Sequence, residues 1–189
     1  APGILVATNS DQAYTTTFAG ETVAVAAQEG WKLSLALRSW GYPGAERPVT
    51  ATTPVATGGD VVEYHRDGLV EWYVNDAEGL EQGVTIAERP GATTGELTIT
   101  FAVDSALRVT SAEDQAIVFA DAAGEAQALY HQITAFDATG TVLPARLAWT
   151  GDAIAWKVDD RRAVYPLTID PRLTNVATGK VSIFVEWLK

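Results

Sequence analysis

Two histidines are the side chains in this sequence best suited to proton transfer or metal binding near neutral pH. His65 lies in the stretch EYHRD and His131 in LYHQI, and each directly follows a tyrosine within a run of alternating apolar and polar residues. A general base or a metal site needs partners of matching chemistry within reach, and neither stretch supplies them. We therefore interpret both histidines as residues of a sheet surface.

Paired carboxylates are the second group with chemical potential. A glycosidase needs two carboxyl groups across a cleft, and Glu63, Glu71 and Glu81 flank the aromatic residues Trp72 and Tyr73. The same combination of rings and acids also binds sugars without cleaving them, and the spacing favours neither activity over a structural face. No serine lies in a G-x-S-x-G motif and the chain has no cysteine, so the sequence has neither a serine in the motif that activates it as a nucleophile nor a cysteine nucleophile. We expect no enzymatic activity.

Acidic turns are the remaining candidates for metal binding. Asn75, Asp76 and Glu78 lie in the turn NDAEG, and Asp159 and Asp160 lie in VDD. Neither turn has the D-x-D-x-D-G pattern that places several oxygens around calcium. We expect solvated turns and no dedicated cofactor, while loose calcium binding at these turns stays open.

Charge and composition exclude several classes of partner. The 189 residues carry a net charge of −11, and only four of them are lysines. Nucleic acid and anionic lipid both need a basic surface, and no apolar run reaches the length of a membrane-spanning helix. We expect neither nucleic-acid binding nor membrane insertion. The sequence begins with Ala1 rather than methionine, so we expect a secretory signal to have been removed and the protein to be extracellular or at the cell surface.

Alternation of apolar and polar residues predicts the elements that position these side chains. WKLSLALRSW (31–40) and ELTITFAV (96–103) have the period of two that is typical of strands. The alanine-rich stretch 111–132 contains Gly124, which favours two strands around a hairpin over a helix. We expect an all-β protein, a two-sheet, sandwich-like body of many short antiparallel strands with little or no helix. It forms a single domain over residues 1–189, with a candidate sub-boundary in the Pro- and Thr-rich segment 47–59.

Two motifs resemble a known family. The stretches VVEYHRDGLVEWYVNDAEGLEQGVTIAERP (61–90) and AVYPLTIDP (163–171) are similar to the β-rich domain that precedes FG-GAP and other propeller-type repeats in large secreted bacterial proteins. The matching residues are Glu71, Trp72, Tyr73, Asn75, Gly79, Leu80, Glu81, Gln82 and Gly83, followed by Tyr165, Pro166, Leu167, Thr168, Ile169, Asp170 and Pro171. The likeness extends over roughly residues 31–171, with Val84 in place of a usual aromatic residue. It implies an extracellular, non-enzymatic module and no catalytic residues.

Apolar segments at both ends of the sequence predict self-association. Residues 174–189 read as a linker followed by a terminal strand that is apolar on both faces. We expect this assembly strand to be donated to a neighbouring copy, which gives a homo-oligomer or a filament. Its apolar residues are Val181, Ile183, Phe184, Val185, Trp187 and Leu188. A second apolar strand is expected at Ile4, Leu5 and Val6. Pairing of the terminal strand within its own chain is the alternative.

A glycan-binding surface is the second hypothesis from the sequence. Trp40 and Tyr42 lie in SWGYPG (39–44), where a proline- and glycine-rich loop would present aromatic rings to a ligand. This candidate ligand loop would make the protein an adhesin or a carbohydrate-binding module. A monomeric docking domain of a larger secreted protein is a further alternative.

Overall fold

The protein is an all-β structure in the computed structural model, which describes residues 3–92 and 95–179. The first sheet contains β1 (Leu5–Asn9), β2 (Tyr14–Ala19), β3 (Thr22–Ala27), β4 (Lys32–Gly41), β5 (Arg47–Pro48), β10 (Glu96–Ser105), β14 (Ala145–Trp149) and β15 (Ala153–Asp159). The second contains β6 (Val55–Gly58), β7 (Val61–Arg66), β8 (Leu69–Asp76), β9 (Gly79–Ile86), β11 (Arg108–Glu113), β12 (Ala116–Ala120), β13 (Ala126–Phe136) and β16 (Leu167–Asn175). A three-residue 3₁₀ helix, η1 (Val176–Thr178), follows β16.

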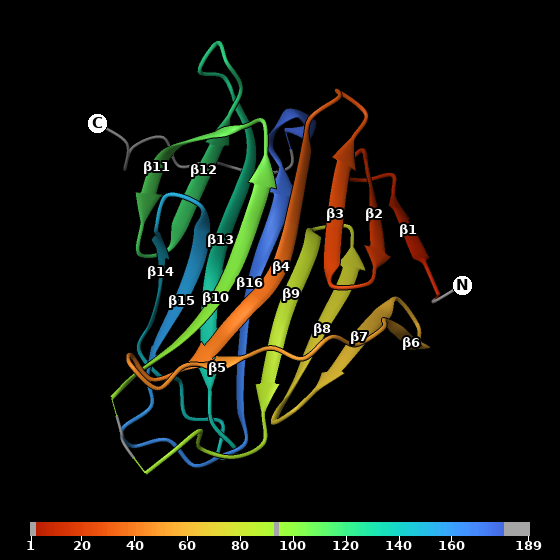
Figure 1. Cartoon of the computed structure of the whole chain (residues 1–189). Coiled ribbons are helices and arrows are strands. Elements are labelled where there is room, and N and C mark those ends of the chain that lie inside the picture. The colour runs from red at the N-terminus through yellow and green to blue at the C-terminus, as the bar shows by residue number, and fades with distance from the viewer. Residues whose placement is uncertain (1–2, 93–94, 180–189) are drawn as a thin grey trace.

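The two sheets pack against each other as the layers of a sandwich (Figure 1). The order in the first sheet is β1-β2-β3-β4-β10-β15-β14, with β5 paired to the end of β4. The order in the second is β11-β12-β13-β16-β9-β8-β7-β6, and neighbouring strands are antiparallel in both. The predicted all-β, two-sheet fold is therefore confirmed. The hairpin expected around Gly124 is also present, since it joins β12 to β13.

Alternating side chains fill the space between the sheets. In β4, Leu33, Leu35 and Leu37 are buried while the residues between them are partly exposed. In β10, Leu97 and Ile99 have the same role. This is the pattern that the sequence predicts for a sheet with one buried face. The segment 47–59 carries the chain from the first sheet, at β5, to the second sheet, at β6.

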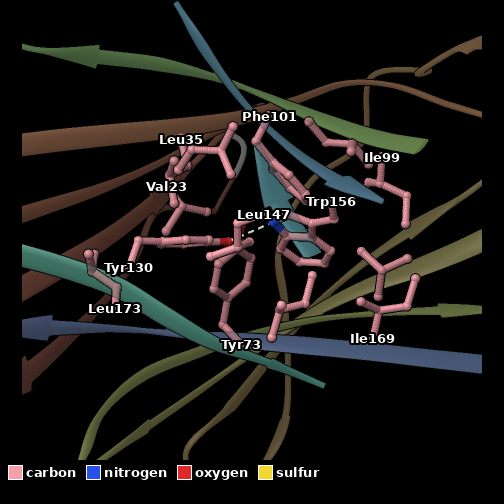
Figure 2. Packing of buried hydrophobic residues seen from close by; sticks show 14 of the residues in the cluster. Val23, Leu35, Tyr73, Ile99, Phe101, Tyr130, Leu147, Trp156, Ile169 and Leu173 are labelled. Atoms are coloured by element: carbon pink, nitrogen blue, oxygen red, sulfur yellow. Dashed lines mark hydrogen bonds between the residues drawn. The ribbon is translucent and has the colours of Figure 1, made fainter. Parts of the chain in front are cut away.

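Large aromatic residues dominate the centre of the core, as Figure 2 shows. Phe101 of β10 and Trp156 of β15 lie with ring centroids 4.6 Å apart. Tyr130 of β13 comes from the opposite sheet, and its hydroxyl accepts a hydrogen bond from the Trp156 indole Nε1 at 3.0 Å. This contact joins the two sheets by a polar bond inside an apolar core.

That bond is one end of a chain of buried hydrogen bonds across the second sheet. The Tyr130 hydroxyl donates to the Gln82 Oε1 at 2.5 Å, and the Gln82 Nε2 donates to the Tyr73 hydroxyl at 2.9 Å. The Tyr73 hydroxyl then donates to the Glu71 Oε1 at 2.6 Å. Burial, together with the neighbouring Glu71 carboxylate, raises the pKa of Tyr73 well above its ordinary value, so the phenol remains a donor.

The other end of the chain is a buried ion pair. The Arg66 Nε donates to the Glu71 Oε2 at 2.8 Å, and both side chains are only 1% exposed. The Arg66 Nη1 also donates to the Glu21 Oε2 at 2.7 Å and to the Thr50 carbonyl at 3.0 Å. Arg66 therefore ties the motif strand β8 to the β2–β3 turn of the first sheet and to the segment 47–59 that connects the two sheets.

A second buried polar cluster, around Asp160, lies just beyond the end of β15. The Asp160 side chain is fully buried, and its Oδ2 accepts hydrogen bonds from the hydroxyls of Tyr42 and Tyr165 at 2.6 and 2.5 Å. The Arg89 Nη1 lies 2.8 Å from the same oxygen. Buried charges of this kind are stable only when they are paired and hydrogen-bonded. Tyr165 begins the YPLTIDP motif, so both motifs contribute to buried polar clusters.

Removing Arg66 tests the buried ion pair. We expect Arg66→Met to lower the free energy of unfolding by about 3–5 kcal/mol, because the Glu71 carboxylate then lies buried without its charge partner. The matched control is Arg38→Met, which breaks the Arg38–Asp152 pair, whose side chains are 47% and 68% exposed, and should cost about 0–1 kcal/mol. Urea denaturation measures both. Equal losses in the two variants would contradict the role given to Arg66.

Candidate functional site

Within residues 3–92 and 95–179, the two sheets have four edge strands, β1, β14, β11 and β6, and hydrogen bonds link the β14 edge to the β11 edge. The backbone N–H of Leu147 in β14 donates to the Asp114 carbonyl, next to β11, at 2.7 Å. The Gln115 Nε2 donates to the Ala145 carbonyl at 2.9 Å. These bonds link the β14 edge of the first sheet to the turn between β11 and β12. An added strand would have to break them.

Strands β11 and β6 have features that discourage pairing with another chain. β11 has a charged residue at each end, Arg108 and Glu113, and its register shifts between Val109 and Ser111. β6 has four residues, and its register shifts between Ala56 and Gly58. Charges, irregular register and short length are the usual protections of a sheet edge.

β1 differs from the other edge strands because it lacks these protections. Residues Leu5–Asn9 include no charge and no proline, and they pair with β2 in an unbroken register. Leu5 and Ala7 pack on the core, whereas Ile4 and Val6 are 63% and 62% exposed. The N-terminal apolar segment predicted at Ile4, Leu5 and Val6 therefore lies at an open sheet edge. Strand β1 is at the outer rim of the first sheet in Figure 1.

Side chains from the second sheet hold only one end of β1. The Asn9 Nδ2 donates to the Asp76 carbonyl at 2.7 Å and to the Asn75 Oδ1 at 2.9 Å. The Asn75 Nδ2 reaches the Thr8 carbonyl at 3.4 Å. Among the residues that the structure describes, no neighbour pairs with the outer side of β1 from Leu5 to Ala7.

The end of β16 lies beside the turn that follows β1. The backbone N–H of Asn175 donates to the Gln12 Oε1 at 3.0 Å, and the Asn175 Nδ2 donates to the Gln12 carbonyl at 2.8 Å. The Asn175 side chain also caps η1 by accepting from the Ala177 N–H. The assembly strand predicted at 181–188 lies outside the described residues.

A polar hollow lies on the outer face of the second sheet. The β13–β16 register pairs His131 with Arg172 and Thr134 with Asp170, so β13 contains one extra residue, which forms a bulge. Gln132, in this bulge, has a φ of 60°. A cavity of about 460 Å³ opens there. The residues that line it are Glu81, Gln115, Gln132, Ile133, Thr134, Asp170, Pro171 and Arg172.

Arg172 organises the charges next to this hollow. Its Nη1 lies 2.5 Å from the Asp76 Oδ1 and its Nη2 lies 3.1 Å from the Glu81 Oε2. Partial burial and repulsion from Glu81 raise the pKa of Asp170 to about 6, and Arg172 only partly offsets this. Burial, with a smaller effect from Arg172, lowers the pKa of His131 to about 4. The imidazole is therefore neutral at pH 7.

Trp72 lies on the same outer face of the second sheet as this hollow, in a row of cross-strand neighbours that runs from Trp72 through Gly83 to Asp170. The indole lies over Gly83, where an added Cβ would be 2.0 Å from a ring carbon, and its Nε1 donates to the Thr85 hydroxyl at 3.2 Å. Ile169 pairs with Val84 and Arg172 pairs with Glu81. This register places Gly83 opposite Asp170. A half-buried aromatic ring and the acidic hollow therefore lie on one face.

The candidate ligand loop at Trp40 and Tyr42 is not an exposed aromatic surface. Their exposed fractions are 2% and 5%. The Trp40 ring contacts the Gly68 backbone and the guanidinium of Arg47, and the Tyr42 hydroxyl belongs to the Asp160 cluster. The expectation that this loop presents its rings to a ligand is wrong, because both rings are buried. Trp40 packs against Gly68 and Arg47, and the Tyr42 hydroxyl is hydrogen-bonded to Asp160.

The three carboxylates that the sequence singled out do not share a cleft. Glu71 faces the core, whereas Glu63 and Glu81 belong to the opposite face of the sheet. His65 lies at the surface, with its Nε2 2.9 Å from the Glu63 Oε2. Period-two alternation separates Glu71 from its sequence neighbours. Asp170 and Gln132 both line the hollow. The sequence did not single them out as site residues, because a bulge leaves no fixed sequence pattern.

Both acidic turns use their carboxylates within the protein. Asp76 pairs with Arg172, Asp160 is buried with Arg89, and Asp159 forms an ion pair with Arg161. Within residues 3–92 and 95–179, no group of three or more histidine and acidic side chains is arranged to hold a metal ion. Loose calcium binding stays an untested prediction.

Comparisons with known proteins leave the family open. No protein-family model matches the chain, and the searches of curated proteins and of solved structures also find no match. The resemblance to the domain that precedes FG-GAP repeats remains an expectation from the two motifs. In the described part of the chain, no helix has the length and apolar character needed to cross a membrane.

The raised pKa of Asp170 predicts a stability change with pH. Because the folded protein holds the proton more tightly than the unfolded chain, the ionised carboxylate lowers stability above about pH 6, and this cost vanishes below about pH 4. We expect Asp170→Asn to raise Tm by about 2–4 °C at pH 7.5, which corresponds to ~1 kcal/mol for a partly exposed group, and to have no effect at pH 4. Thermal melts at the two pH values check this.

Asp152→Asn is the matched control. The Arg38 guanidinium lowers the pKa of the exposed Asp152, so its loss should not stabilise the fold at either pH. A destabilised Asp170→Asn variant at pH 7.5 would contradict the electrostatic account of the hollow.

Proposed function

We propose that this protein is a non-enzymatic structural module that self-associates by strand addition at β1. The occupant of the β1 edge is the segment 181–188 of a second copy. The resemblance to secreted bacterial domains favours an extracellular or cell-surface location for the assembly. One-way donation from copy to copy extends into a filament, whereas mutual exchange closes a dimer.

The observation that carries the proposal is the unprotected edge of β1. An edge strand exposes a row of backbone N–H and C=O groups, and proteins usually block such a row. The other three edges carry charges, register breaks or bonds to the opposite sheet. β1 instead offers a regular backbone, and Val6 in the strand and Ile4 just before it are exposed apolar side chains. Strand addition would satisfy the backbone groups and cover the apolar surface.

The sequence of the segment 181–188 suits the role of the added strand. Val181, Ile183, Val185 and Trp187 alternate with residues that include Phe184 and Leu188. A strand that is apolar on both faces is stable only where both faces are covered. No proline interrupts the segment, so it is free to pair along its length.

The end of β16 lies next to the β1–β2 hairpin. Asn175, four residues before the end of the described chain at Gly179, is bonded to Gln12 in the turn after β1. A segment that starts there could add to its own β1 edge or to that of a neighbour. Protein concentration distinguishes the two, because only pairing between copies depends on it.

Mass measurements across a concentration series test the proposal. Light scattering and negative-stain microscopy are applied to the intact chain, to a chain truncated after Lys180 and to Val6→Lys. We expect the intact chain to form concentration-dependent assemblies, and both variants to stay folded monomers, because one lacks the donor and the other places a charge on the acceptor edge. Circular dichroism confirms that each variant is folded.

Val164→Lys is the matched control, since Val164 is 51% exposed in the loop before β16. It should assemble like the intact chain. An intact chain that remains monomeric at high concentration would overturn the proposal, and so would a Val6→Lys variant that assembles normally.

A further inference from the structure

We propose that the hollow on the outer face of the second sheet binds a neutral glycan. Its volume of about 460 Å³ lies within the range of small-molecule sites in proteins. The site is built by β9, β13 and β16, whereas the assembly edge is β1 of the first sheet. Glycan binding would therefore be a second activity, independent of strand addition.

Two polar groups in the hollow are available to a ligand. The Asp170 carboxylate accepts no hydrogen bond from any residue in the described part of the chain, although it is partly buried. The side-chain amide of Gln132 is exposed, and within the same residues only its backbone groups are bonded, to Gln115 and Thr134. A carboxylate that tolerates partial burial without a donor is ready to accept hydroxyl hydrogens.

The mixture of donors and acceptors favours a polyhydroxylated ligand over an ion. Arg172 adds a positive charge between Asp170 and Glu81, so a metal cation would meet a guanidinium as well as carboxylates. An anion would meet two carboxylates. Sugar hydroxyls both donate and accept, and therefore suit the carboxylates and the amide of Gln132 together.

The bulge in β13 supplies the shape of the site. Two residues of β13, Gln132 and Ile133, lie opposite the single residue Pro171 of β16, whose ring nitrogen has no hydrogen to donate. Gln132 is held at a φ of 60°, a conformation that favours glycine. Gln132 therefore occupies a backbone conformation that glycine would adopt more easily. Its side-chain amide lies at the rim of the hollow.

Trp72 supplies an apolar surface in the same row. Its indole lies against Gly83, because the missing side chain leaves room for the ring beside Asp170. Aromatic rings next to hydrogen-bonding groups provide an apolar surface for the C–H face of a sugar. A glycan chain laid along this row would contact the ring and the hollow at once.

The test uses a panel of soluble neutral hexasaccharides, with cello-, xylo-, manno- and malto-oligosaccharides titrated into the full chain by isothermal calorimetry. We expect at least one to bind. Asp170→Asn and Gln132→Gly should each weaken that binding by about 5–10-fold, the effect of losing one hydrogen bond. Gln132→Gly keeps the backbone conformation while removing the amide.

Gly83→Ala tests the position of Trp72, since the new Cβ must displace the indole while every residue that lines the hollow is kept. It should weaken binding by a similar factor. Gly91→Ala, with nothing within 4 Å of its added Cβ, and Gln28→Ala, at an exposed position in the turn between β3 and β4, should leave binding unchanged.

Three results would overturn the inference. They are the absence of binding by every oligosaccharide in the panel, binding that the three site variants do not weaken, and binding that a chelator abolishes. The strand-addition test is separate. A chain truncated after Lys180 that no longer assembles but still binds the sugar would support both proposals. An intact chain that binds a sugar but does not assemble would contradict only strand addition, and an intact chain that assembles but binds no sugar would contradict only glycan binding.

Discussion

A chain of buried hydrogen bonds from Arg66 to Trp156 constrains both sheets of this protein. Each member would lose a partner if its strand slipped by one residue, because alternation would turn its side chain to the opposite face. An unpaired polar group in the core costs about 1–3 kcal/mol, and an unpaired charge costs more. The Glu71–Tyr73–Gln82 segment of the chain therefore fixes the register of β8 on β9, and the bond from Trp156 to Tyr130 holds the first sheet against the second. Glu71, Tyr73 and Gln82 of the first motif therefore have a structural role in the core.

The two candidate surfaces depend on that fixed register. Glu71 and Gln82 face the core, so Trp72, Glu81 and Gly83 must face outward, and Glu81 lines the polar hollow. The same order of strands leaves β1 at the rim of the first sheet. The buried bonds thus set the outer face and the edge without contacting a ligand or a partner. Assembly and glycan recognition would occupy separate parts of one rigid body.

Much of the fold could be predicted from alternation alone. The inward leucines of β4 and the hairpin at Gly124 are as the sequence indicates, because both follow from local rules. The rest depends on contacts between distant residues. Trp40 and Tyr42 look like ligand residues in a loop, yet Arg47 and Asp160 hold them in the interior. Burial and repulsion from Glu81 on the facing strand β9 raise the pKa of Asp170, and Arg172 on its own strand β16 partly offsets this. The bulge beside Asp170 arises from the pairing of β13 with β16, which no single segment encodes. The segment 181–188 lies outside the described residues, so its role is still a prediction.

Hydrogen exchange at the backbone amides of β1 tests the central proposal most directly. Exchange is measured on the intact chain at low and at high concentration, with β14 as the reference edge because its Leu147 amide is already bonded to Asp114. If β1 accepts a strand from another copy, protection of those amides between Leu5 and Ala7 that point away from β2 will rise with concentration, while protection in β14 stays constant. Exchange from β1 that is the same at both concentrations would contradict strand addition between copies.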